Sequence, residues 1–246
     1  MDTRARYAAY ADRIEAVSPS YAAWARSLDD ALVALLAEVP EQQRQPELFF
    51  AVARRLGADP SDPGALGALG LEARPALVTA LASATVQAND PRRLAPVVPL
   101  FAALAERSVR PLGLVDAGAA AGLCSIPDRV TLDHRTSESR VPAERAPVPS
   151  SRPDSSGRDD HGGARTELVR MHTAVDEPAV RLVADVSGVL PAPASRPIRI
   201  GARIALDPNP IDLAAPGAFD RLVEAVPPEA TDRTALMRAA ASATSL

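Results

Sequence analysis

The chain has little of three residue types that mark common functional classes. Cys124 is the only cysteine among 246 residues, which excludes an internal disulfide and any metal site built from a cysteine cluster. The three histidines, His134, His161 and His172, stand at no spacing typical of metal ligands, so we expect no bound metal. Aromatic residues make up only 3% of the chain. The core must therefore be built mainly from leucine, valine and alanine.

The sequence also lacks the segments that would direct it to nucleic acid or a membrane. Its net charge is −4, and its 27 basic residues are dispersed, so no basic stripe for nucleic acid is present. No apolar run of about 20 residues occurs. Residues 1–6 lead into an amphipathic pattern rather than the apolar core of a signal peptide. We therefore expect a cytoplasmic protein with no nucleic-acid or membrane partner.

Helical periodicity dominates the first 110 residues. Apolar side chains recur at spacings of three and four residues in segments that begin near residues 7, 21, 46, 75 and 91. Pro46 is expected to open one of these helices and Gly57 to close it. Pro96 and Pro99 are expected to kink the last helix or delay its start. We assign residues 1–110 to a helical N-terminal region.

From residue 111 the pattern changes to strands. The apolar run 111–116 suits a buried parallel strand, and β-branched residues predict further strands at 168–171, 180–186 and 198–206. Residues 134–165 are rich in proline, serine and glycine, which is typical of a disordered insertion. Helices are expected again near residues 219–226 and 229–241. The fold class is therefore α/β, with residues 111–246 as a partial, Rossmann-like region.

The stretch 114–122 is the most informative, because it reads as a strand, an acidic residue and a loop of small residues. Such a loop lets backbone N–H groups approach a ligand closely. Gly118 and Gly122 lie four residues apart, whereas the dinucleotide fingerprint sets its outer glycines five apart. The frame of a nucleophile elbow also fits, but a hydrolase needs serine where this chain has Ala120. A turn that only packs a helix on a strand stays open as an alternative.

Other candidate site residues flank this loop. Asp207 ends the last predicted strand, the position from which a carboxylate accepts hydrogen bonds from ribose hydroxyls in nucleotide-binding folds. An aspartate before proline is also a common turn starter. Asn89 and Arg92 lie upstream of the first strand and are weaker candidates, since polar residues at such junctions often serve as caps.

Four segments of the chain resemble a bacterial family, domain of unknown function 2332 (DUF2332): residues 44–50, 87–93, 114–123 and 206–212. The loop is similar to the first motif of class I S-adenosylmethionine-dependent methyltransferases, D-x-G-x-[GA]-x-G. This resemblance implies that Asp116 fixes the loop and the methionine part of the cofactor, with Gly118, Ala120 and Gly122 forming the loop. The family typically has serine in place of Ala120 and asparagine in place of Cys124. Its members continue beyond the position of the last residue, so we expect an incomplete sheet in a truncated member.

These observations predict a small-molecule ligand, S-adenosylmethionine or a related adenosine compound, held by Asp116, the loop and Asp207. The sequence leaves open whether the protein is an enzyme; if it is, the resemblance implies a methyltransferase. The alternative is a non-catalytic interaction module. An incomplete sheet would expose a strand edge, through which the protein would form oligomers.

Overall fold

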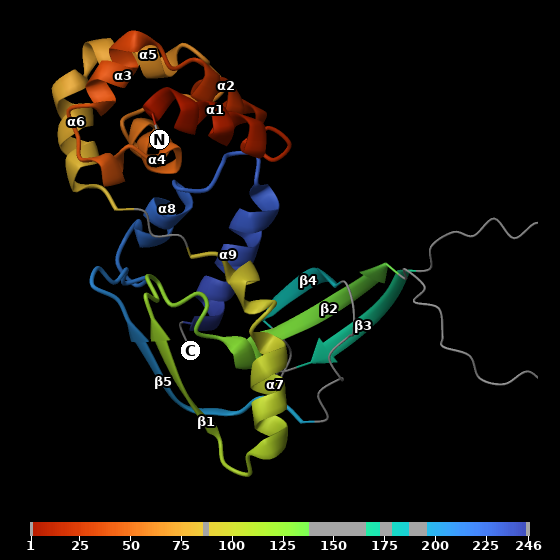
Figure 1. Cartoon of the computed structure of the whole chain (residues 1–246). Coiled ribbons are helices and arrows are strands. Elements are labelled where there is room, and N and C mark those ends of the chain that lie inside the picture. The colour runs from red at the N-terminus through yellow and green to blue at the C-terminus, as the bar shows by residue number, and fades with distance from the viewer. Residues whose placement is uncertain (1, 86–88, 138–165, 173–178, 187–195, 245–246) are drawn as a thin grey trace, which may run out of the picture. The chain divides into compact units, whose positions relative to one another are not determined.

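The computed structural model describes residues 2–85, 89–137, 166–172, 179–186 and 196–244. It is a mixed α/β structure with helices first and small sheets after them, as the sequence predicts (Figure 1). The described chain divides into two compact units, which are treated separately. The first comprises Met1–Arg93, Gly113–Ile126 and Ala202–Leu246, and the second Leu94–Leu112 and Pro127–Gly201.

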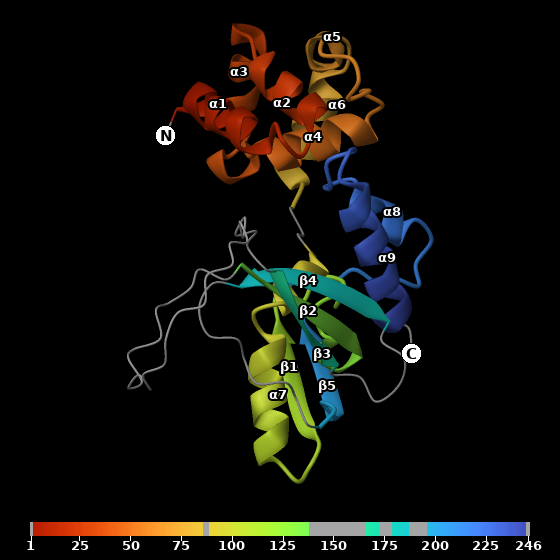
Figure 2. The same cartoon turned by 90° about the vertical axis from the view of Figure 1, so that its right-hand side faces the viewer.

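Six helices form a cluster at the N-terminal end of the chain in both views (Figure 1, Figure 2). The ring of Phe50 lies at the centre of their core, 5.0 Å from the ring of Tyr21 and 5.4 Å from that of Trp24, measured between centroids. Most of the chain's few aromatic residues belong to this core. The elements are α1 (Thr3–Ile14), α2 (Pro19–Arg26), α3 (Asp30–Leu36), η1 (Glu41–Gln43), α4 (Pro46–Arg55), α5 (Ala65–Glu72) and α6 (Arg74–Ser83).

Local capping divides this region more finely than periodicity predicts. The apolar pattern from residue 21 to residue 35 is split into α2 and α3, because the Asp29 side chain accepts a hydrogen bond from the Leu32 N–H (2.8 Å) and opens a new helix. The predicted boundaries of α4 are confirmed: Pro46 is its first residue, and Gly57 follows it with φ at +96°. The helix α5 is absent from the prediction. It carries Gly70, which lowers helical propensity; an added Cβ there would lie 2.9 Å from Leu32 Cδ2, so a larger residue would require the Leu32 side chain to shift.

The strands of the described residues form two sheets (Figure 1). The strands predicted at 168–171, 180–186, 198–206 and 111–116 are present, but the strand at 111–116 is not buried as expected. Its residues alternate between half-buried and exposed, with Val115 63% exposed, because it belongs to a two-stranded sheet. One sheet pairs β1 (Leu112–Ala117) with β5 (Ile200–Leu206). The other has the order β3-β2-β4, in which β2 (Val130–Ser137) runs antiparallel to β3 (Thr166–His172) and parallel to β4 (Val180–Val186).

The central strand β2 corrects the prediction that the insertion begins at residue 134. Residues 134–137 continue β2, and His134 is buried. The strand contains a buried carboxylate, Asp133, which accepts hydrogen bonds from Arg170 Nε and Arg181 Nε at 2.7 Å each. The polar residues 133–137 can therefore lie in a central strand, because Arg170 and Arg181, which are distant in the sequence, neutralise the charge of Asp133. The rest of the predicted insertion, residues 138–165, lies outside the described residues.

The remaining elements are short helices. The expected delay at Pro96 and Pro99 is confirmed, because α7 begins only at Val98, after a separate 3-10 turn. Among the described helices none can cross a membrane alone; α5 and α6 reach the required length and composition only together, across a 100° bend. These last elements are η2 (Pro91–Leu94), α7 (Val98–Arg107), η3 (Pro127–Arg129), α8 (Ala218–Val223) and α9 (Thr231–Thr244).

Candidate functional site

The strands β1 and β5 bring the two predicted aspartates to the same edge of a sheet. Leu112 N–H donates to the Arg199 carbonyl (2.8 Å), and Gly118 N–H donates to the Leu206 carbonyl (2.8 Å), so both strands run in the same direction. The carboxyl ends of parallel neighbours meet at one edge. Asp116 and Asp207 are therefore spatial neighbours although 91 positions separate them in the sequence.

The loop after β1 requires left-handed backbone at three positions. The φ angles are +78° at Gly118, +50° at Ala120 and +73° at Gly122. Glycine adopts such angles without penalty, whereas an alanine there is strained. Ala120 thus departs from the glycine motif in its side chain while keeping the backbone conformation that glycine favours.

Asp207 fastens this loop to the end of β5. Its Oδ2 accepts a hydrogen bond from the Ala120 N–H (2.8 Å), and its Oδ1 accepts one from the Asn209 N–H (2.8 Å). The Ile211 N–H in turn donates to the Ala120 carbonyl (3.1 Å). The carboxylate therefore holds the strained residue from one side while the chain that follows it holds the other.

Asn89 clamps the loop from a third direction. Its side chain is buried, with 4% of the residue exposed. Asn89 Nδ2 donates to the Ala119 carbonyl (2.7 Å), and its Oδ1 accepts from the Leu123 N–H (3.1 Å). One amide thereby satisfies a donor and an acceptor of the buried loop, which explains the residue type at this position.

Asp116 is held by a residue that the sequence did not mark as part of the site. The Ser125 hydroxyl, which is buried, donates to Asp116 Oδ2 at 2.7 Å. Between them in the sequence, the Cys124 Sγ donates to the Asp90 carbonyl (3.4 Å). Burial and the nearby charge of Asp116 raise the pKa of the Cys124 thiol to about 11. The thiol is therefore protonated at neutral pH and is not poised as a nucleophile.

Arg92 does not reach the loop in this structure. Its guanidinium pairs with Asp90, with Nη2 2.7 Å from Oδ2, and Arg233 Nε lies 3.2 Å from the same oxygen. Burial alone would raise the pKa of Asp90, but the hydrogen bonds from Arg92 and the charge of Arg233 outweigh it and hold the pKa below its ordinary value. Arg92 therefore closes the turn that begins η2, while its neighbour Asn89 is the residue that meets the loop.

The loop has few hydrogen-bond donors to offer a ligand. The backbone N–H groups of residues 118, 119, 120, 122, 123 and 125 all donate to protein oxygens. Asp116 and Asp207 remain as acceptors, and within the described chain neither forms an ion pair with an arginine. The loop opens at Gly118, where an added Cβ would meet nothing within 4 Å. Such a site suits a ligand that donates hydrogen bonds and carries positive charge, rather than a phosphate.

A cavity of about 230 Å³ lies beside the chain that follows Asp207. Ile211, which is bonded to the loop through Ala120, forms part of its wall. Its lining is largely apolar, with hydroxyls and two guanidinium groups added, a composition typical of small-molecule pockets. The lining residues are Leu48, Ala51, Val52, Arg55, Ser83, Ala84, Thr85, Ile211, Arg221, Leu222 and Ala225.

Sequence reasoning missed Ser125, Ile211 and Arg233. Ser125 closely follows the glycine loop and the acidic strand end, and this position could have predicted that its hydroxyl bonds to Asp116. The other two have no local signal, because Ile211 acts through its backbone and Arg233 reaches Asp90 from α9. In the residues that the structure describes, no three histidine, cysteine or acidic side chains gather as a metal site.

Comparison with known proteins gives one match. A family model described as "Uncharacterized protein conserved in bacteria (DUF2332)" matches residues 4–245. No curated protein and no solved structure matches the chain. The match spans both the helical region and the two strand ends of the site.

Proposed function

The chain belongs to the DUF2332 family, and we propose that it binds S-adenosylmethionine or a related adenosine ligand at the carboxyl ends of β1 and β5. The two carboxylates at this edge, Asp116 and Asp207, carry the proposal. They lie beside an open glycine position, and within the described chain no arginine neutralises them.

The chemistry of the ligand matches the groups that the site leaves available. A ribose offers hydroxyl donors, and the methionine part offers an ammonium group and a sulfonium charge. Each carboxylate oxygen can accept more than one hydrogen bond, so Asp207 can hold ribose hydroxyls while it still holds the Ala120 N–H. Asp116 keeps Oδ1 for the ammonium group, because Ser125 occupies only Oδ2.

Methyl transfer is the reaction that such a ligand supports, because bound S-adenosylmethionine supplies an electrophilic methyl group. The protein then has to position the methyl group in line with an acceptor and exclude water. The cavity beside Ile211 offers space for an acceptor of modest size. Cys124 is not that acceptor, since its thiol stays protonated.

The proposal is tested by calorimetry with S-adenosylhomocysteine and S-adenosylmethionine. We expect one site per chain in the wild type and affinity at least about tenfold lower in Asp116→Asn, because a charged hydrogen bond contributes about 1.5–3 kcal/mol. Asp212→Asn is the matched control. Asp212 accepts the Ala214 N–H (2.9 Å) in a similar turn but lies outside the strand ends, so this variant should bind normally. Folded wild-type protein that binds neither compound at millimolar concentration would refute the proposal.

A role as an interaction module is the second candidate, and one observation favours it. Ile204 and Leu206 are two residues apart on β5 and so share a face, yet they are 51% and 54% exposed. Exposed apolar strand faces are typical of contact surfaces. Light scattering distinguishes the candidates: oligomers that Ile204→Thr/Leu206→Thr disperses favour this role, whereas a monomer at all concentrations argues against self-association.

A further inference from the structure

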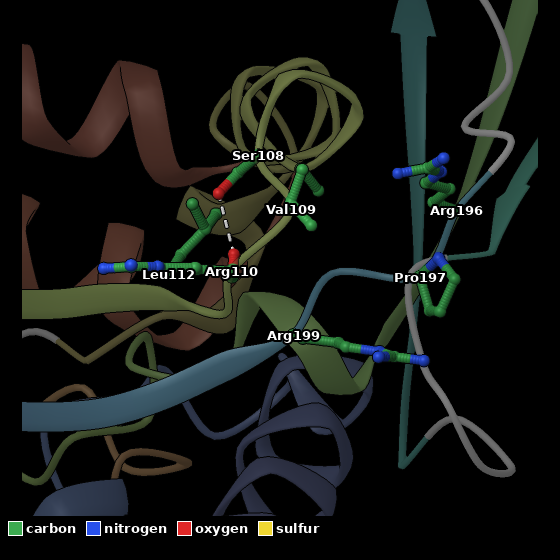
Figure 3. A pocket seen from close by; sticks show the side chains of 8 residues that line it. Ser108, Val109, Arg110, Leu112, Arg196, Pro197 and Arg199 are labelled. Atoms are coloured by element: carbon green, nitrogen blue, oxygen red, sulfur yellow. Dashed lines mark hydrogen bonds between the residues drawn. The ribbon is translucent and has the colours of Figure 1, made fainter.

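A second cavity, of about 300 Å³, lies at the opposite ends of β1 and β5, in the second unit (Figure 3). It is bounded by the end of α7, the turn into β1 and the segment that leads into β5. Its walls combine four apolar residues with a serine and three arginines. The lining residues are Ala105, Ser108, Val109, Arg110, Leu112, Arg196, Pro197 and Arg199.

Within the described residues, the side chains of the three arginines of this cavity have no acidic partner, whereas many other arginines of the chain do. The chain contains no lysine, and its acidic residues outnumber its 27 arginines at 31. Elsewhere guanidinium groups find carboxylates, as Arg55 does with Glu224 (2.8 Å). Arg110, Arg196 and Arg199 make no side-chain hydrogen bond or ion pair within the described residues. Three arginines without an acidic partner among the described residues therefore line one small cavity.

Arg196 and Arg199 lie on either side of Pro197, and Arg110 lies apart from them. Figure 3 shows Arg196 above Pro197 and the side chain of Arg199 below it, whereas the guanidinium of Arg110 runs the other way, past Leu112. The turn that carries Arg110 is tied by the Ser108 hydroxyl, which donates to the Arg110 carbonyl (2.7 Å).

A carboxylate anchors the backbone of this segment. Glu106 Oε1 accepts a hydrogen bond from the Arg196 N–H (2.9 Å). The arginines also donate no hydrogen bond to the last carbonyls of α7, so helix capping does not account for their placement. Within the described residues, the donors of Arg196 and Arg199 have no protein acceptor and are free for a ligand of the cavity.

We propose that this cavity binds a small organic phosphate or diphosphate, with Arg196 and Arg199 as the anion ligands. A guanidinium presents planar paired donors that match phosphate oxygens, which a point charge does not. The volume fits a small molecule and excludes a duplex. Ala105, Val109 and Leu112 offer apolar contact to its carbon part. This site is independent of the adenosine ligand proposed for the other ends of the strands.

The probe is inorganic pyrophosphate, measured by calorimetry on the full chain. The wild type should bind one pyrophosphate per chain, with affinity that falls as salt rises. The double variant Arg196→Gln/Arg199→Gln should bind at least about tenfold more weakly, since two charge-assisted bonds are lost. Arg107→Gln, which removes a charge from the neighbouring end of α7 but does not line the cavity, should bind normally.

Three results would overturn this site. They are no pyrophosphate binding by folded wild-type protein, equal weakening in the Arg107→Gln control, and unchanged binding in the double variant with native circular dichroism. Asp116→Asn should leave pyrophosphate affinity unchanged, so failure of the adenosine site and failure of this site are separately visible.

Discussion

Ala120 concentrates the strain of the loop in one residue. Its φ of +50° is a conformation that costs an L-residue about 1 kcal/mol relative to glycine. Asp207 and Ile211 oppose that cost by hydrogen bonding to the N–H and the carbonyl of Ala120, in the peptide units before and after its Cα. Position 120 therefore reveals that the loop is maintained by its neighbours rather than by its own sequence.

Replacing Ala120 with glycine should raise the free energy of unfolding by about 0.5 kcal/mol, because relief of strain exceeds the added entropy of the unfolded chain. Urea unfolding measures the change. Ala117→Gly is the control, since Ala117 ends β1 and lacks a positive φ, so glycine there should destabilise by about 0.5–1 kcal/mol. Equal destabilisation by both variants would contradict the strained geometry.

Asn89 should be the most costly polar residue of the site to remove. In Asn89→Ala the buried Ala119 carbonyl and Leu123 N–H lose their partners, and we expect a loss of about 2–4 kcal/mol in unfolding free energy. Gln42→Ala, at an exposed position of η1, should change it by less than about 0.5 kcal/mol. Thermal and urea unfolding report both values, and similar small effects would show that Asn89 does not clamp the loop.

At the scale of elements, the sequence predicts those helix limits that depend on residues close to one another in the chain. Pro46, Gly57, Pro96 and Pro99 act on their own backbone, so the limits of α4 and the late start of α7 follow from the sequence. The strand β2 does not, because Asp133 is tolerable in a buried strand only after Arg170 and Arg181 arrive from β3 and β4. Such distant compensation leaves no local pattern.

The ion cluster of β2 should make stability depend on pH. Hydrogen bonds from Arg170 and Arg181 outweigh burial and hold the pKa of Asp133 below its ordinary value. A lowered folded-state pKa stabilises the fold above the unfolded pKa, and this contribution disappears as pH falls below about 4. Asp133→Asn should therefore lower unfolding free energy more at about pH 7 than at about pH 3.

The control for this pH effect lies on the same sheet. Asp185 faces Arg135 at 3.6 Å, but its side chain is 87% exposed, and exposed pairs contribute little. Asp185→Asn should leave the pH dependence of urea unfolding as in the wild type. A deficit for Asp133→Asn that is constant over the same pH range would contradict a stabilising charge on Asp133.

At the scale of the molecule, β1 and β5 present opposite chemistry at their two ends. Their carboxyl ends carry the acceptors Asp116 and Asp207, and their amino ends lie beside three arginines whose side chains have no partner among the described residues. The acidic edge was predictable, because both aspartates stand at the ends of apolar runs. The sequence did not predict that the N–H groups of the loop bond to protein oxygens. Two of these bonds depend on Asn89 and Asp207 meeting the loop in space.

The adenosine site at Asp116 and Asp207 carries the proposed function, and backbone amide NMR tests it directly. On addition of S-adenosylhomocysteine, the amide signals of residues 116–122 and of Asp207, Asn209 and Ile211 should shift together and saturate, while those near Arg196 and Arg199 stay in place. Signals that do not move at saturating ligand, or that move only outside the two strand ends, would contradict the site at Asp116 and Asp207.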